Sequence, residues 1–181
     1  MDTQQLVDVR VIHRFAAPPA RVFDAWLDPD AISRWLLASS PDDDIIDIDR
    51  DARVGGKFSF KVRRAGKEID HVGEYRELAR PQRLVFTFDV VGGGAPASGR
   101  AVADLDASKP SVVTIDLAPA GTGTELVLSH EGVPPEMRDK TRQGWTTIVA
   151  EIAGMIDAAE ARARGIPLPR AIPARAARSS R

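Results

Sequence analysis

The chain contains no cysteine. This absence excludes disulfide bonds, thiolate metal sites, cysteine nucleophiles and iron–sulfur clusters. The sequence also lacks an excess of charge of one sign, because 25 basic and 26 acidic side chains leave a net charge of −1 over 181 residues. A dedicated nucleic-acid-binding protein depends on a basic surface. We therefore expect no nucleic-acid partner.

Long hydrophobic runs are missing as well. The apolar runs of the sequence are only a few residues long, whereas a membrane-spanning helix needs about 20 consecutive apolar residues. Residues 1–30 also lack the positive start and apolar segment of a signal peptide. We therefore expect no membrane insertion and a cytoplasmic location.

The length and composition predict one domain followed by a tail. Residues 1–164 have the size of a single domain. Residues 165–181 are rich in proline, arginine and alanine, and they carry too little apolar surface to offset the entropy of ordering, so we predict a disordered basic tail. The glycine-rich residues 92–110 are predicted to form a loop, either a lid or a disordered segment.

The first part of the domain combines a strand with two short helices. Alternating valines predict a strand at residues 7–15. Two prolines at 18 and 19 favour a helix over residues 20–27, and Asp30 is predicted to cap a second short helix that contains Trp35.

The middle of the chain changes to an apolar period of two, which is typical of strands. Turn residues separate these segments, so the pattern predicts an antiparallel meander with one apolar face. The segments that show this pattern are residues 45–48, 58–62, 69–78, 83–91, 111–118 and 124–131.

The final element is predicted to be a long helix over residues 135–164 that ends at Gly165. Apolar residues recur on it every three or four positions, and this stripe can cover the apolar face of the sheet. The stripe consists of Met137, Thr141, Trp145, Ile148, Ile152, Ile156 and Ala159. The predicted fold class is α+β, with an antiparallel sheet curved around the long C-terminal helix.

A series of short motifs follows the order found in a known superfamily. The motifs are PARVF (19–23), DP (28–29), RW (34–35), GGKF (55–58), GEY (73–75), RPQRLVFTF (80–88), TEL (124–126), SHEG (129–132) and GWT (144–146). With this order the domain resembles the SRPBCC superfamily, also called START-like, Bet v 1-like or helix-grip. Its motifs are most similar to those of the subfamily of homologues of the activator of the heat-shock-protein-90 ATPase.

This resemblance implies a helix-grip fold with six to seven strands and a hollow between the sheet and the long helix. Members of the superfamily bind apolar ligands in that hollow, and some cyclise or hydrate polyketides there. One eukaryotic branch stimulates a chaperone ATPase, which implies a link to the stress response. Because one fold supports many functions, the function must be argued from the site.

Strand alternation predicts which side chains face the hollow. We favour the face of residues 69–78 that carries His71 and Tyr75, with Glu77 as a further polar group, because Glu74 and Arg76 are better suited to water. An apolar wall with a few polar groups is typical of a ligand pocket. The predicted ligand-binding residues are Trp35, Phe58, Phe60, His71, Tyr75, Phe86, Phe88, Leu128, His130, Trp145 and Ile148. The competing interpretation is a filled core whose histidines and tyrosine are simply hydrogen-bonded.

Three hypotheses for function remain open. The first is a binding module for a small apolar or aromatic molecule. The second is a cyclase or hydrolase that uses His71, Tyr75 or His130 as acid and base. The third is a protein-interaction module that contacts a chaperone or another protein. The sequence leaves open whether the chain is a monomer or a homodimer.

No cofactor or metal is expected, because the histidines lack the spacing of a zinc motif and no phosphate loop or nucleophile elbow is present. The acidic residues 42–51 lack the EF-hand pattern. Alternation instead predicts that Asp47, Asp49 and Asp51 lie on a solvated strand face.

Overall fold

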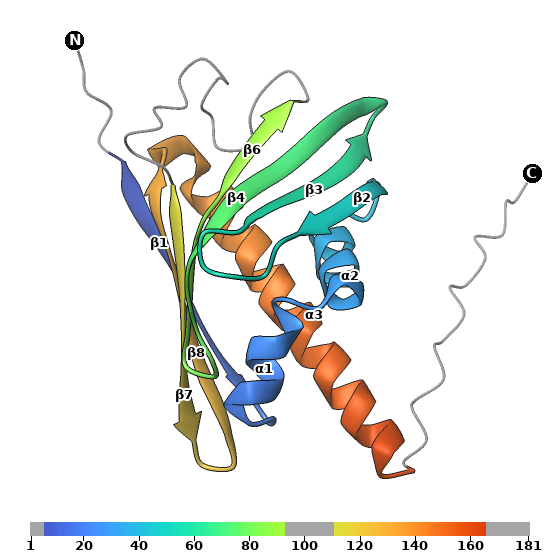
Figure 1. Cartoon of the computed structure of the whole chain (residues 1–181), viewed down its shortest axis with the longest axis vertical. Helices are drawn as coiled ribbons and strands as arrows, with labels where there is room; N and C mark the ends of the chain where they lie inside the picture. The colour runs from blue at the N-terminus through green and yellow to red at the C-terminus, as the bar shows by residue number, and fades with distance from the viewer. Residues whose placement is uncertain (1–5, 93–110, 166–181) are drawn as a thin grey trace, which may run out of the picture.

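A computed structural model describes residues 6–92 and 111–165 of the chain (Figure 1). The predictions for the glycine-rich loop and for the basic tail fall on residues 93–110 and 166–181, which lie outside the described residues. The described residues confirm the predicted α+β helix-grip fold. Within them, no helix is long and apolar enough to cross a membrane.

In the described residues, eight strands form one antiparallel sheet in the order β1-β8-β7-β5-β4-β3-β2, and β6 pairs with the part of β4 that precedes the part paired with β5. The first and last strands of the domain are therefore neighbours in the sheet. The strands are β1 Val7–Phe15, β2 Asp44–Arg50, β3 Lys57–Arg64, β4 Lys67–Ala79, β5 Arg83–Thr87, β6 Asp89–Gly92, β7 Val112–Ala120 and β8 Gly123–Val133.

The helices lie together on one face of this sheet (Figure 1). They are α1 Pro19–Ala25, α2 Pro29–Ser39, the 3-10 turn η2 Pro135–Met137 and α3 Arg138–Ala163. The predicted long helix is confirmed, with its first turn in 3-10 form. Gly165 follows it with φ +69°, the left-handed conformation expected of a glycine that ends a helix.

The start of α2 differs from its prediction. The capping residue is Asp28 rather than Asp30, because its side chain accepts a hydrogen bond of 2.9 Å from the backbone N–H of Ala31. Pro29 then occupies the first helical position, where its missing N–H is harmless. Asp30 lies in the first turn, where its charge suits the positive end of the helix dipole.

The segment predicted as one strand over residues 83–91 is divided into β5 and β6. Both parts pair with β4, β5 with its second half and β6 with its first half. The division occurs beside Gly73 of β4, where the Thr87 carbonyl and the Phe58 ring occupy the place that a β-carbon would need. Only glycine allows this close approach, and the strand is interrupted at Phe88, the residue after Thr87.

The core lies between the helices and the concave face of the sheet. Alternate residues of β3, β5, β7 and β8 point into it, and the buried side chains of α3, from Trp145 to Ile156, pack in the same core. The fully buried members with the largest side chains include Ile32, Leu84, Ile115, Leu126, Leu128 and Ile152. The predicted inward face of β4 is confirmed for His71 and Tyr75, both of which are buried.

Candidate functional site

The centre of the predicted hollow is a packed aromatic cluster. The rings of Phe58 and Phe60 stack with centroids 4.8 Å apart, and Tyr75 and Phe86 lie against Phe58 at 5.4 and 5.8 Å. The void among them measures about 20 Å³, which is room for about one water molecule. Leu128 is also fully buried. These five predicted ligand-binding residues therefore lie in filled core.

A much larger pocket opens at one end of this cluster, between α2, the first half of α3 and the adjoining strands. Its volume of about 330 Å³ falls at the lower end of the roughly 300–1,000 Å³ typical of small-molecule sites. The predicted residues that line it are Trp35, His71, Phe88, His130, Trp145 and Ile148. The predicted site is thus divided between a closed core and an open pocket.

A glycine of α3 contributes to the wall of the pocket. Gly144 lines the pocket, and a β-carbon built on it would meet no atom within 4 Å. A glycine inside a helix costs about 1 kcal/mol relative to alanine. Together these observations show a helix position where a larger side chain would extend into empty space.

His130 of β8 is held on both sides of its ring. Its Nδ1 accepts a hydrogen bond of 2.9 Å from the Trp145 indole N–H, and its Nε2 contacts the Ser111 hydroxyl. Because Nδ1 is an acceptor, the neutral ring carries its proton on Nε2 and donates it to Ser111. Burial lowers the pKa of His130 to about 4, so the ring is neutral near pH 7. In this arrangement neither nitrogen is available to a substrate, and the role that the geometry supports is to hold Trp145 against the pocket.

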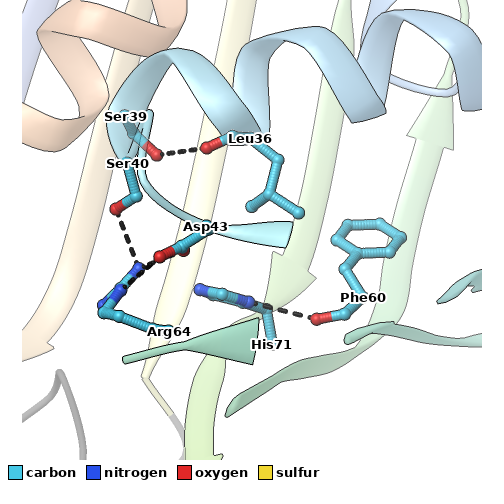
Figure 2. Close-up of polar contacts among 7 residues, drawn as sticks. All are labelled: Leu36, Ser39, Ser40, Asp43, Phe60, Arg64 and His71. Atoms are coloured by element: carbon cyan, nitrogen blue, oxygen red, sulfur yellow. Dashed lines mark hydrogen bonds and ion pairs between the residues drawn. The ribbon is translucent and has the colours of Figure 1, made fainter. Parts of the chain in front are cut away.

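His71 of β4 has one nitrogen engaged and one open. Its Nδ1 lies 3.1 Å from the Phe60 carbonyl oxygen, and Figure 2 marks this contact with a dashed line. A carbonyl can only accept, so Nδ1 carries the proton and Nε2 has a lone pair. Burial lowers the pKa of His71, which favours this neutral form. No residue in the described part of the chain hydrogen-bonds Nε2.

A polar cluster at the pocket edge was not foreseen from the sequence. Arg64 donates from Nε and from one terminal nitrogen to both oxygens of Asp43, at 2.7 and 2.6 Å, and from the same terminal nitrogen to the Ser40 hydroxyl at 2.8 Å (Figure 2). The Asp43 side chain is only 3% exposed. The acidic run was interpreted as a solvated surface, so burial and pairing of Asp43 were not predicted.

The remaining acid–base candidates lie away from the pocket. Burial raises the pKa of Tyr75 to about 12, so its hydroxyl stays protonated in the closed core. Glu77 was expected to converge on the histidines, but a register shift in β4 after Tyr75 alters the alternation, and Glu77 pairs at the surface with Arg83 at 3.3 Å. Of the groups considered for proton transfer, His71 is the one with an open nitrogen in the pocket.

Other pocket residues come from segments that the sequence treated only as helix or strand. Their signal was weak, because the first half of α3 mixes polar residues into the apolar stripe. They are Leu36, Ser39, Ser40, Arg64, Asp89, Val90, Met137, Lys140, Thr141, Gln143, Gly144 and Thr147. In the described residues, no group of three or more potential ligands is placed to hold a metal ion.

Solved structures share this fold. A protein from Chromobacterium violaceum is 26% identical, with a TM-score of 0.64 over 83% of this chain and 96% of its own. An AHSA1-like protein from Aeromonas hydrophila is 23% identical, with a TM-score of 0.64 over 85% of this chain and 94% of its own. A protein of unknown function from Staphylococcus aureus is 17% identical, with a TM-score of 0.69 over 87% of this chain and 98% of its own. A comparison with curated proteins gave no match.

The comparison with family models agrees with the order of the sequence motifs and with the fold. The model described as Activator of Hsp90 ATPase homolog 1-like protein matches residues 16–157, a range that runs from the end of β1 to the last third of α3. The chain therefore belongs to the Activator of Hsp90 ATPase homolog 1-like family.

Proposed function

We propose that this protein binds a small apolar or aromatic molecule in the pocket between α2, α3 and the sheet. The observation that carries the proposal is the pocket itself, about 330 Å³ in volume, beside a core that is otherwise closed. Most of the accessible wall area is apolar, and polar side chains contribute the rest. This combination is typical of sites that bind small molecules.

The state of the aromatic walls supports the proposal. The Trp145 indole is held by its hydrogen bond to His130, and its ring centroid lies 5.3 Å from that of Phe88. The ring centroid of Trp35, at the inner end, lies 6.1 Å from that of Phe60. These rings are positioned before any ligand arrives, so binding requires little ordering of side chains. A preorganised site gains affinity because less entropy is lost on association.

The competing hypotheses remain predictions. For an enzyme, His71 is the group available to transfer a proton. For a protein-interaction module, the surface of the described residues offers isolated ion pairs such as Arg14–Glu125 and Arg80–Asp24, which are exposed and contribute little individually. Neither hypothesis rests on an observation as specific as the pocket.

The test uses a glycine pair on α3. Gly144→Leu places a side chain in the pocket, whereas Gly154→Leu makes the same change at an exposed position of the same helix that lies outside this pocket; at both sites a new β-carbon meets nothing within 4 Å. The probes are naphthalene, 2-naphthol and 2-methoxynaphthalene. Their binding is measured in 1H–15N spectra through the signals of the three tryptophan indoles.

We expect saturable shifts of the Trp35 and Trp145 signals in the wild-type protein and in Gly154→Leu, with at least about tenfold weaker binding in Gly144→Leu. Trp26 lines the small void and not the pocket, so its signal is the internal reference. Native mass spectrometry of the gently purified protein would then show whether a cellular molecule occupies the site. Equal binding to both leucine variants, or no saturable shift with any probe in a protein that also purifies empty, would contradict the proposal.

A further inference from the structure

The open nitrogen of His71 indicates what kind of apolar molecule the pocket takes. His71 is 8% exposed and lines the pocket, and no described residue hydrogen-bonds its Nε2. Such a group inside a pocket is satisfied when a ligand brings the missing partner. We propose that the pocket selects apolar molecules that carry a neutral hydroxyl group, which donates its hydrogen bond to Nε2 of His71. This inference rests on the proposed function.

The proton positions in the site require a donor on the ligand. The Phe60 carbonyl fixes the proton of His71 on Nδ1, so Nε2 can only accept. An ether or a ketone has no hydrogen to offer to this lone pair. A carboxylate has none either, and its own lone pairs would face the lone pair of Nε2. A hydroxyl group supplies the hydrogen without bringing a charge into the pocket.

The oxygen of that hydroxyl also has a partner in the pocket wall. Arg64 uses Nε and one terminal nitrogen for Asp43 and Ser40, so its second terminal nitrogen retains two N–H groups with no bond to a described residue. In Figure 2 the His71 ring edge opposite Phe60 is turned toward Arg64 and Asp43, and both His71 and Arg64 line the pocket. A hydroxyl donates and accepts at once, which matches an open acceptor on His71 and an open donor on Arg64 in the wall of the same pocket.

The charge of the site also favours a neutral group. Asp43 is buried and takes a bidentate bond from Arg64, so the guanidinium charge is already compensated. Beside His71, an anionic ligand would approach this compensated pair, whereas Lys140, which also lines the pocket, is exposed to solvent. A hydroxyl gains two hydrogen bonds there without the desolvation cost of a carboxylate.

The test compares three probes of one ring system in the full-length protein: 2-naphthol, 2-methoxynaphthalene and 2-naphthoate. We expect 2-naphthol to bind about fivefold tighter than the methyl ether, the ratio that one net hydrogen bond provides, and 2-naphthoate to bind more weakly than 2-naphthol. Isothermal titration calorimetry gives the three dissociation constants. His71→Phe keeps a ring against Phe88. In this variant 2-naphthol and its methyl ether should bind with about equal dissociation constants, and the dissociation constant of the ether should match that of the wild type. His13→Phe, on β1 outside the pocket, is the matched control.

A second measurement needs no variant. In the free wild-type protein the 15N shift of His71 Nε2 should be that of an unprotonated ring nitrogen, and it should move toward the protonated range on binding 2-naphthol but not on binding the ether. If alcohol and ether bind equally, the inference is wrong while the pocket proposal stands. If 2-naphthoate binds tightest, the site recognises anions and the inference is again wrong. If none of the three binds, the proposed function itself fails.

Discussion

The indole N–H of Trp145 on α3 donates to Nδ1 of His130 on β8, across 2.9 Å inside the core. This bond fixes which nitrogen of the histidine carries the proton and fixes the plane of the indole at the pocket wall. It therefore couples the protonation state of one side chain to the position of another. The coupling leads to the first two predictions.

The first prediction concerns acid stability. The pKa of His130 is lowered to about 4 by burial, and about 6.5 is usual for a histidine in an unfolded chain. The unfolded chain therefore binds more protons between these values, so the free energy of unfolding is highest above pH 6.5 and falls by about 3 kcal/mol as the pH drops to 4. His71, whose pKa is also lowered, adds to the loss in the same direction.

Urea denaturation at a series of pH values measures this slope. His130→Asn places an amide oxygen where Nδ1 accepts from Trp145 and removes the titrating ring, so the slope should become shallower. An unchanged slope in His130→Asn would contradict the assignment of the titrating group.

The second prediction concerns how much Trp145, which is 4% exposed, contributes to the free energy of unfolding. Trp145→Ala should lower the free energy of unfolding by about 3–5 kcal/mol. Trp145→Phe keeps most of the packing but leaves Nδ1 of His130 without its donor, so we expect a smaller loss of about 1–3 kcal/mol. Denaturant titrations of both variants separate packing from hydrogen bonding. A loss below about 1 kcal/mol in Trp145→Ala would show that α3 is packed differently.

The third prediction concerns the Arg64–Asp43 pair. Arg64→Met leaves the buried Asp43 carboxylate without its main donor, which should destabilise the protein by about 3 kcal/mol, the lower end of the range for a broken buried pair because Arg64 itself is partly exposed. The double variant with Asp43→Asn should recover part of the loss. Arg63→Met removes the neighbouring exposed contact to Glu68 and should cost at most about 1 kcal/mol. Additive effects in this double-mutant cycle would show that the pair is not coupled.

The fourth prediction concerns two glycines with opposite surroundings. A β-carbon at Gly73 collides with the Thr87 carbonyl and the Phe58 ring, whereas at Gly154 it meets nothing. Gly73→Ala should destabilise the protein by about 3 kcal/mol, at the upper end of overpacking costs. Gly154→Ala should stabilise α3 by about 1 kcal/mol. Thermal unfolding of both variants measures these changes in stability. If Gly73→Ala leaves the stability unchanged, β4 and β5 can move apart at this position without cost.

Much of the fold could be predicted from the sequence because its signals are local. Period-two alternation located the strands, and the long stripe located α3. Where a local rule was ambiguous the prediction missed: Asp28 and Asp30 are both good caps, and only the geometry at Ala31 decides between them. The division of residues 83–91 depends on an approach of Gly73 to Thr87, which is a tertiary contact that no local pattern encodes.

The candidate site was predictable in composition but not in shape. Alternation correctly placed His71 and Tyr75 on the inner face, yet it cannot tell a filled interior from an open one. That difference depends on how aromatic rings pack, as Phe58 and Phe60 do. The Arg64–Asp43 pair joins residues 21 positions apart in the sequence, and charge patterning alone treats both as surface.

The open space beside Gly144 has an evolutionary consequence. A helix position that is destabilised by glycine and has room for any side chain is one where random substitution improves the fold. Drift alone would therefore replace the glycine across lineages, and only a need for the vacant volume would retain it. Gly154 is equally unobstructed but lies outside the pocket, so its rate of substitution is the reference for comparison. If glycine is retained among orthologues more often at position 144 than at position 154, selection maintains the open volume of the pocket.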